Sequence, residues 1–331
     1  MTDAASILGL GHYVPERVLT NTDLERMVDT SDEWITSRTG IRERRMAEPG
    51  QTCSDLALAA GEKALAAAGM RPEDLTHIIV ATFTPDAYIP STGCVLQHRL
   101  GAVNSVAFDL AAACSGFLYS LENARGILAL HPDAKVLVVA SEVVTSRVNF
   151  KDRSTCVLFG DGAGAVVVGR PGKDQKALAG IRDVLLKSDG SVSDLLTVRG
   201  GGSSRPPLLG HPVDEDYFVA MQGSEVFKHA VRNMYAVSVS LLERNGLGKE
   251  HIDLFIPHQA NGRIVDALSR KLAFPGERIF VNLDLYGNTS AASIPLALSE
   301  AYAQGRITPG DRVLLTTFGG GFTWGSGLLE F

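Results

Sequence analysis

Three side chains of this sequence have types that could together do nucleophilic chemistry: the thiol of Cys114, the imidazole of His258 and the carboxamide of Asn288. A thiolate accepts an acyl group from a thioester and so divides one difficult transfer into two easier steps. Imidazole and carboxamide N–H groups are neutral donors that stabilise a developing oxyanion or enolate. Brought together, the three groups would suit carbon–carbon bond formation.

Cys114 stands behind three alanines and ahead of a Ser-Gly pair, in the stretch DLAAACSGF. A helix that begins at or just before the cysteine is predicted, because apolar side chains recur on one helical face at Phe117, Leu121, Ala124 and Leu128. Free N–H groups at a helix start lower a thiol pKa from about 8.5 into a range of about 3.5–7.5. We therefore expect a thiolate near pH 7; the alternative is a packing residue, since free cysteine is often buried.

His258 follows the apolar run FIP, where a strand is expected to leave its sheet, a usual location of ligand-binding groups in open α/β folds. Gln259 and Asn261 follow closely and are expected to hold the imidazole ring. Asn288 lies in YGNTS, and an asparagine after glycine is also typical of a turn. A buried core histidine and a simple turn residue are the alternatives at these two positions.

The four cysteines, Cys53, Cys94, Cys114 and Cys156, stand far apart in the sequence and form neither a CxxC redox pair nor the closely spaced pairs of a zinc site. Cys156 is expected to pack in the core, and Cys53 and Cys94 have no supporting residues around them. Free thiols and no metal site are predicted.

An internal duplication explains how such distant residues could meet. AAGMRPEDLTHIIVAT (67–82) resembles ERNGLGKEHIDLFIPH (243–258), and this alignment places Gly69 opposite Gly246. AKVLVVAS (134–141) and DRVLLTTF (311–318) are separated by the same distance along the chain. A constant offset over several features indicates two copies of one architecture.

Each copy reads as strand, helix, strand, helix and strand, followed by a glycine-rich turn and a last strand. The middle strands are expected to end at Asp109 and Asp284. Nearly continuous apolar strands are typical of sheets covered by helices on both faces, so an α/β fold is predicted. The halves would be 1–172, which carries the cysteine, and 173–331, which carries the histidine and asparagine. Similar halves tend to pack about a pseudo-twofold axis, so their corresponding loops would converge.

Length and composition set wider bounds. A chain of 331 residues with 45% hydrophobic and 21% charged residues is a globular protein of about two domains. Its net charge of −6 argues against general nucleic-acid binding. The N-terminus lacks the pattern of a secretory signal, and no apolar stretch approaches the ~20 residues of a membrane span. A cytoplasmic protein without a membrane partner is expected.

With these residues assembled, the sequence resembles the β-ketoacyl-acyl carrier protein synthase III family, condensing enzymes of the thiolase superfamily that start bacterial type II fatty acid synthesis. The resemblance covers essentially the whole chain. Its motifs are DTSDEWITSRTGIRERR (29–45), DLAAACSGF (109–117), FGDGAGA (159–165), PHQAN (257–261), YGNTSAAS (286–293) and FGGGFTWGSG (318–327). It implies a thiolase-like, five-layered αβαβα fold of two duplicated halves, a homodimer, and a catalytic triad at Cys114, His258 and Asn288.

The resemblance also implies a reaction order. A short acyl-CoA, acetyl-CoA foremost, acylates Cys114; malonyl-acyl carrier protein then loses CO2, and its enolate attacks the acyl-enzyme to give a 3-oxoacyl product. The acyl-CoA is a substrate, and no cofactor is expected. Gly320 matches an oxyanion-hole amide, and Phe318 belongs to the surroundings of the active site.

For the CoA nucleotide, the family pattern implies Trp34 and Arg153 on either side of the adenine and Arg38 on a phosphate. The pantetheine arm would run along Thr30, Gly223, Phe227 and Asn261. Indole and guanidinium planes both stack on a purine, and arginine binds phosphate through two hydrogen bonds. A half-buried anchoring role is the alternative for Trp34.

The helix expected at 262–272 turns apolar residues inward and presents Arg263 and Arg270 on its outer face. With Lys271 and Lys228, these residues would dock the acidic acyl carrier protein, although such charges are usually just a solvated face. Ile89 falls where the family places a residue that limits acyl-chain length and is donated across the dimer, which implies a short primer pocket. The loop 198–212 looks longer and richer in glycine and proline than usual.

Three other readings remain open. A related Cys-His-Asn starter synthase or acyltransferase of polyketide or quinolone biosynthesis would share the same motifs. A non-catalytic partner of this fold should have lost a triad residue, and all three are present. A dinucleotide-binding oxidoreductase is disfavoured, because the GLG near the N-terminus lacks a third glycine and Pro15 obstructs the helix that should follow.

Overall fold

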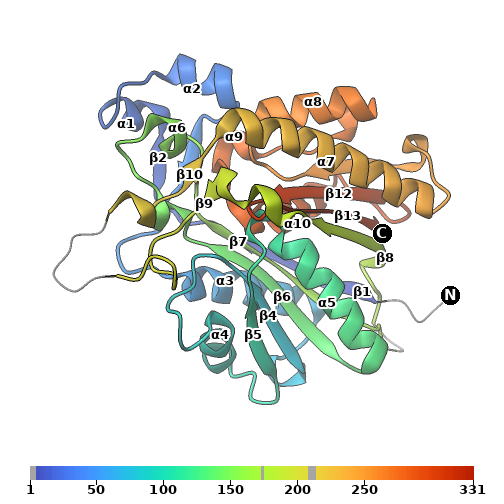
Figure 1. Ribbon diagram of the computed structural model, residues 1–331. Helices are drawn as coiled ribbons and strands as arrows, with labels where there is room; N and C mark the ends of the chain where they lie inside the picture. The colour runs from blue at the N-terminus through green and yellow to red at the C-terminus, as the bar shows by residue number, and fades with distance from the viewer. Residues whose placement is uncertain (1–4, 173–174, 208–213) are drawn as a thin grey trace.

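The computed structural model describes residues 5–172, 175–207 and 214–331, and within these ranges one nine-stranded sheet joins both halves of the chain (Figure 1). The strand order is β11-β12-β13-β8-β1-β7-β6-β4-β5. The first half contributes β1 (Ser6–Tyr13), β4 (His77–Ala81), β5 (Val106–Leu110), β6 (Lys135–Glu142) and β7 (Gly162–Gly169). The second half contributes β8 (Ala179–Ser188), β11 (Leu254–Pro257), β12 (Arg312–Gly319) and β13 (Thr323–Glu330).

The two halves of the sheet meet where β1 pairs with β8, through Ser6 opposite Gly180 and Ile7 opposite Ala179. Outward from this junction, each half of the sheet has antiparallel pairings first and then a parallel pairing. The parallel pairs are β6 with β4 in the first half and β12 with β11 in the second. Two small antiparallel ladders lie outside the sheet: β2 (Val18–Thr20) with β3 (Glu43–Arg45), and β9 (Leu196–Thr197) with β10 (Ala220–Met221).

Helices form three layers around the sheet halves (Figure 1). The outer layers are α3 (Cys53–Ala68) with α4 (Thr92–Leu100), and α7 (Gly223–Arg244) with α8 (Gly262–Leu272); the central layer is α5 (Gly116–Leu130) with α10 (Ser293–Ala303). A separate apolar core lies on each side of the central layer, and a third surrounds the central helices themselves. The predicted α/β class and thiolase-like αβαβα architecture of two related halves are therefore confirmed.

Short helices complete the chain. They are α1 (Asn21–Glu25), α2 (Asp32–Thr39), α6 (Arg153–Cys156), α9 (Leu283–Tyr286) and the 3-10 turns η1 (Pro72–Asp74), η2 (Ala113–Ser115), η3 (Val144–Arg147), η4 (Gly190–Leu195), η5 (Glu215–Tyr217), η6 (Lys249–His251), η7 (Gly276–Arg278) and η8 (Ser290–Ala292). No helix in the described ranges combines the length and apolar character needed to cross a membrane.

The constant offset found in the sequence recurs in the structure. The separation of Gly69 and Gly246 also relates the starts of β4 and β11, of β6 and β12, and of α5 and α10. The two glycines end α3 and lie just beyond α7, with φ of 62° and 65°, a left-handed conformation that glycine adopts without steric cost. The division at 172/173 stays a prediction, because residue 173 lies outside the described ranges.

The prediction of a strand that ends at Asp284 is wrong. The segment thought to end a strand at Asp284 makes only an isolated bridge, Ile279 with Phe255, and Asp284 itself lies in α9. The side chain of Gln259 explains the difference: its Nε2 donates to the carbonyl of Phe280 at 3.3 Å, and its Oε1 accepts from the N–H of Asn282 at 3.3 Å. These contacts occupy backbone groups that a longer ladder would use.

Candidate active site

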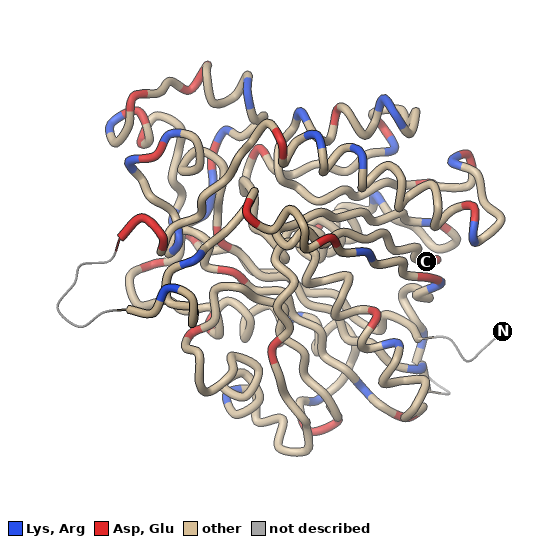
Figure 2. Tube along the Cα trace, viewed as in Figure 1, with Lys and Arg blue, Asp and Glu red and all other residues tan. Residues whose placement is uncertain are grey.

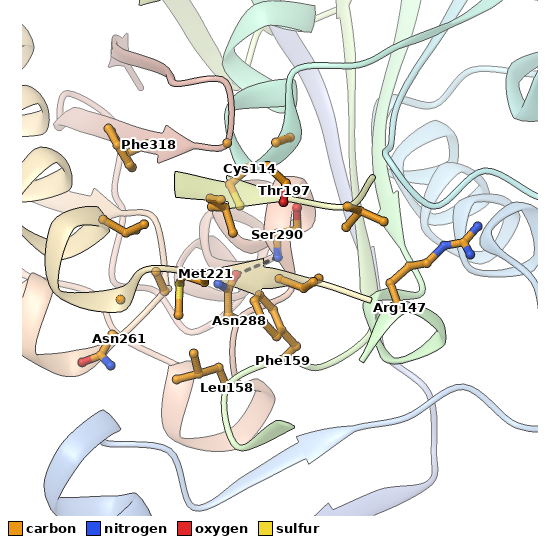
Figure 3. Close-up of a pocket in the computed structure, with 18 of the residues that line it drawn as sticks. Cys114, Arg147, Leu158, Phe159, Thr197, Met221, Asn261, Asn288, Ser290 and Phe318 are labelled. Carbon is orange, nitrogen blue, oxygen red and sulfur yellow. Dashed lines mark hydrogen bonds between the residues drawn. The ribbon is translucent and has the colours of Figure 1, made fainter. Parts of the chain in front are cut away.

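A cavity of about 1350 Å³ lies between the halves, and Cys114, His258 and Asn288 all line it. Figure 3 shows Cys114 and Asn288 facing the same space, with Ser290 between them. The duplication argument therefore predicted correctly that the three residues meet. Their chemical roles are taken up under Proposed function.

Cys114 lies in η2, directly ahead of α5, and the second half of the chain holds it there. The hydroxyl of Thr317 donates to the carbonyl of Cys114 at 2.9 Å, and the hydroxyl of Thr323 donates to the carbonyl of Ala112 at 3.0 Å. A Cβ on Gly319 would come within 2.7 Å of the Cys114 nitrogen. The last residue of β12 must therefore lack a side chain for the cysteine turn to pack so closely.

The pKa of Cys114 contradicts the expectation from the helix start. Burial is the main cause that raises the pKa of the Cys114 thiol to about 11; hydrogen bonding with Ser290 lowers this pKa, and the charge of Glu142 contributes to raising it. Desolvation penalises a thiolate more than the short turn stabilises it. The free protein therefore holds Cys114 as a thiol near pH 7.

His258 is 2% exposed, and burial lowers the pKa of its imidazole to about 4. Its Nδ1 lies 2.6 Å from the hydroxyl of Ser293, the first residue of α10. A hydroxyl both donates and accepts, so Ser293 can hold the ring in either neutral tautomer. Within the described ranges no hydrogen bond engages Nε2, which leaves this atom for the cavity.

The expected ring partners of His258 are wrong. Gln259 donates to the carbonyls of Pro257 and Phe280, and the Asn261 side chain caps α8 by accepting from the N–H of Arg263 at 2.9 Å. Ser293 is the hydrogen-bond partner of the ring instead. The sequence did not indicate this contact, because Ser293 lies far from His258 along the chain.

Asn288 is fixed by a segment of the first half. Its N–H donates to the carbonyl of Leu158 at 2.8 Å, and its carbonyl accepts from Gly160 at 3.1 Å. Its Oδ1 accepts from the N–H of Ser290 at 2.9 Å (Figure 3). The carboxamide is thereby oriented, and no hydrogen bond in the described part of the chain engages Nδ2. Two amide donors remain for a ligand.

Most of the residues assigned to CoA line the same cavity, namely Trp34, Arg38, Gly223, Phe227 and Asn261. Arg153 stacks directly on Trp34, with its guanidinium carbon 4.7 Å from the ring centroid, and its Nη1 donates to the carbonyl of Asp29 at 2.9 Å. An adenine between them needs about 3.5 Å on each side, so Arg153 would have to swing away. The Oγ1 of Thr30 is buried and has no hydrogen-bond partner among the residues that the structure describes.

The four basic residues assigned to carrier-protein docking lie on α7 and α8, and two of them line the cavity. Figure 2 shows Lys and Arg positions along α8 and the adjoining α7. Arg263 and Lys228 line the cavity; Arg263 lies over Phe227, and Lys228 pairs with Glu225 at 2.7 Å. Arg270 and Lys271 occupy the last turn of α8, whose inner face buries Ile264, Leu268 and Leu272 as predicted.

Phe318 and Gly320 line the cavity near Cys114, and Phe318 packs on Phe322 with ring centroids 4.6 Å apart. Ile89 does not line the cavity of this single chain and is 89% exposed. Val198 and two of the glycines that follow it line the cavity, so the first part of the 198–212 loop borders the site. Residues 208–213, which include the end of that loop, lie outside the described ranges.

Two residues near Cys114 were not predicted from the sequence. Ser290 lines the cavity between Cys114 and Asn288, and Glu142 is fully buried behind it. Ser290 stands in the motif YGNTSAAS, but a serine in a turn gives no signal of its own. Glu142 is the last residue of an apolar strand, and an acidic residue at that position was the signal in the sequence that could have indicated a functional group. Within the described ranges no cluster of three or more His, Cys, Asp or Glu residues is arranged to hold a metal ion.

Comparison with known proteins agrees with this geometry. Residues 108–190 match the family 3-oxoacyl-[acyl-carrier-protein] synthase III, and residues 242–331 match its C-terminal counterpart. A β-ketoacyl-[acyl-carrier-protein] synthase III of Oleidesulfovibrio alaskensis is 57% identical over 330 residues, with 100% of both chains covered. The chain belongs to the 3-oxoacyl-[acyl-carrier-protein] synthase III family.

Solved structures extend this synthase III assignment. The crystal structure of the 3-oxoacyl-[acyl-carrier-protein] synthase III of Aquifex aeolicus aligns with a TM-score of 0.90 and 46% identity, covering 99% of this chain and 100% of that one. The priming β-ketosynthase of the R1128 polyketide pathway also aligns with a TM-score of 0.90, at 35% identity, covering 99% of this chain and 97% of that one. The fold is shared by both kinds of enzyme, and the sequence is more similar to the first.

Proposed function

We propose that this synthase III condenses a short acyl-CoA, acetyl-CoA foremost, with malonyl-acyl carrier protein through an acyl-Cys114 intermediate, and so starts type II fatty acid synthesis. The observation that carries the proposal is the convergence of a thiol, a neutral imidazole and an oriented carboxamide on one cavity. The residue roles below follow from that arrangement.

In the first half-reaction, Nε2 of neutral His258 takes the proton of the Cys114 thiol while Nδ1–H donates to Ser293. The sulfur attacks the thioester carbonyl of the acyl-CoA, and the backbone amides of Cys114 and Gly320 stabilise the oxyanion. The carbon–sulfur bond to CoA breaks, and the departing CoA sulfur takes the proton back from His258. The products are the acyl-enzyme and free CoA.

In the second half-reaction, the malonyl group loses CO2, and the electron pair of the broken bond becomes an enolate. Between the half-reactions the neutral ring releases its Nδ1 proton and takes up one at Nε2 by exchange with water. Nε2–H of His258 and Nδ2–H of Asn288 then donate to the enolate oxygen, with Ser293 donating to Nδ1. Because the pKa of His258 lies at about 4, the ring is neutral and does not protonate the carbanion. The enolate carbon attacks the acyl-Cys carbonyl, the new carbon–carbon bond forms, and Cys114 leaves as a thiolate.

The substrates would enter by the mouth between α2 and α8. CoA would stack on Trp34 once Arg153 swings aside, with Arg38 on a phosphate and Thr30, Gly223, Phe227 and Asn261 along the pantetheine. The acidic carrier protein would dock on Arg263, Arg270, Lys271 and Lys228. In the described part of the chain the buried Oγ1 of Thr30 has no hydrogen-bond partner, which is consistent with a polar ligand near it.

The working form would be a homodimer. Tyr88 and Ile89, neighbours in the sequence, are 76% and 89% exposed, and a second copy packed on them would cover both side chains. A second copy would receive Ile89 at the end of its acyl pocket, which limits the primer to a short chain. All four cysteines are free thiols, as a reducing cytoplasm would keep them.

Intact-mass measurement after incubation with a panel of acyl-CoAs tests the nucleophile and identifies the primer together. We expect a single acyl addition on the wild type, none on Cys114→Ser, and the full addition on Cys94→Ser, a matched control because Cys94 is an exposed free thiol. Undiminished labelling of Cys114→Ser would refute the mechanism.

A second measurement separates the half-reactions. His258→Ala and Asn288→Ala should each lower malonyl decarboxylation by about 100-fold or more, because each removes a donor to the enolate oxygen. Acyl transfer to Cys114 should survive in Asn288→Ala. Running the assay with malonyl-CoA against malonyl-acyl carrier protein distinguishes a fatty-acid initiator from a polyketide-type starter synthase, and a preference for malonyl-CoA would favour the latter.

A further inference from the structure

A buried carboxyl group lies behind the reactive cysteine. Glu142, the last residue of β6, is 0% exposed. Its Oε2 accepts hydrogen bonds from the hydroxyls of Thr82 and Thr84 at 3.0 and 2.7 Å, and from the N–H groups of Phe83 and Thr84 at 3.2 Å. So many donors on one oxygen fix the carboxyl group rigidly and leave Oε1 for another partner.

That partner is Ser290. Its hydroxyl donates to Oε1 of Glu142 at 3.1 Å. Ser290 and Cys114 line the same cavity, and hydrogen bonding by the Ser290 side chain lowers the pKa of the Cys114 thiol. The backbone of Ser290 is in the left-handed region, with φ of 51°, and its N–H is fixed by Asn288. Ser290 therefore stands at a defined point between the carboxyl group and the sulfur.

The hydroxyl of Ser290 has a single proton to share between these two neighbours. When Glu142 is a carboxylate, Ser290 donates to Oε1, and its oxygen can only accept from the thiol. When Glu142 is a carboxylic acid, its own O–H can donate to Ser290, and Ser290 is then free to donate to a Cys114 thiolate. The state of Glu142 thus decides which state of the sulfur is stabilised.

We propose that Glu142 is a positioning residue that controls the nucleophile through Ser290: as the acid it lets Ser290 stabilise the Cys114 thiolate, and as the carboxylate it withdraws that hydrogen bond and adds a like charge. The proposal rests on Cys114 being the nucleophile of the proposed function. It adds a group that sets how thiolate formation depends on pH.

Glu142 would change state within the working range of pH. Burial raises the pKa of Glu142 to about 7, in spite of its hydrogen bonds. The titratable groups that face it are Cys53 on α3 and Cys114 on η2, whose pKa values burial raises to about 12 and about 11. Asp86 contributes negative charge beside Cys53. Within the described ranges no cationic side chain pairs with Glu142.

Alkylation of Cys114 by iodoacetamide, followed by mass spectrometry from pH 5.5 to 9.5, tests the proposal. The rate follows the thiolate population, since the thiolate is the nucleophile. In the wild type we expect a tenfold rise per pH unit up to about 7, then a flatter profile as Glu142 ionises. Glu142→Gln stays neutral, so its rate should go on rising and exceed the wild-type rate at pH 9 by about tenfold or more.

Two further variants make the result specific. Ser290→Ala should show a weaker break in the profile, because only the charge of Glu142 remains. Asp161→Asn is the matched control: burial also raises the pKa of Asp161, to about 6, but its carboxyl group accepts from Ala47 and Thr145, away from the cysteine. We expect it to keep the wild-type profile.

A wild-type profile without a break between pH 6 and 8 would overturn the proposal even if no variant folded. A break that persists unchanged in Glu142→Gln would also overturn it, and so would one that persists unchanged in Ser290→Ala. Alkylation requires neither acyl-CoA nor carrier protein. If condensation failed while the profile behaved as expected, the proposed function would be wrong and this inference would stand.

Discussion

The turn that carries Cys114 has a twin in the other half of the molecule. Ala113 and Ser290 are related by the same offset as Gly69 and Gly246, and both adopt the left-handed region, with φ of 45° and 51°. Each begins a 3-10 turn that runs into a central helix, η2 into α5 and η8 into α10. The backbone is the same, but the residue after the strained position is Cys114 in one turn and Ala291 in the other.

The same contrast appears at two strand ends. By the offset that relates the two turns, His258 corresponds to Ala81 and Glu142 corresponds to Gly319. At each matched pair, one half supplies a reactive or ionisable group and the other supplies a residue of minimal size. Gly319 lies against the backbone of Cys114, where a Cβ would come within 2.7 Å of its nitrogen. The duplication provides the same backbone arrangement twice, and the small residues of one half leave space for the reactive side chains of the other.

The strongest test of this comparison moves the thiol to the twin turn. Ala291→Cys in a Cys114→Ala background keeps one cysteine in an equivalent backbone position. Ala291 is 1% exposed and does not line the cavity, so the displaced thiol would be packed in the core. We expect condensation to fall by at least about a thousandfold, as for loss of a nucleophile. Acylation of the displaced thiol, detected by intact mass, would show that the two turns are interchangeable.

A smaller loss of activity is expected from a substitution at Gly319, where the second half of the chain packs against the cysteine turn. Gly319→Ala would place a methyl group 2.7 Å from the Cys114 nitrogen, so the cysteine turn must shift. We expect kcat to fall by about tenfold or more with little change in KM, because a displacement of about 1 Å at a reacting group is costly. Gly126→Ala is the control, since a Cβ there meets nothing within 4 Å and the residue lies in α5. Equal kcat in both variants would contradict the close fit.

Much of this arrangement was readable from the sequence. The matched positions of Gly69 and Gly246 predicted two copies of one architecture, and the convergence of Cys114, His258 and Asn288 followed from it. These inferences succeeded because backbone periodicity and turn chemistry are local properties that a sequence displays directly.

What the sequence concealed depends on packing between distant segments. The role of Ser293 as partner of His258 arises only when α10 lies beside β11. The high pKa of Cys114 reflects burial by both halves, which outweighs the helix start that the sequence does display. The missing strand before Asp284 was replaced by hydrogen bonds from a single side chain, Gln259. None of these effects has a local pattern.

The smallest effect concerns the strain that the two turns share. Ala113→Gly removes a Cβ from a left-handed residue, which relieves about 1–2 kcal/mol, while the freer unfolded chain offsets about 0.4–1 kcal/mol. We expect the free energy of unfolding to rise by about 0.5–1 kcal/mol, measured by chemical denaturation. Ala112→Gly is the control: with φ of −144° that residue has no such strain, so its variant should be less stable than the wild type. If both variants lost stability equally, the left-handed turn would carry no strain, and the cysteine would owe its position to the contacts from Thr317 and Gly319 alone.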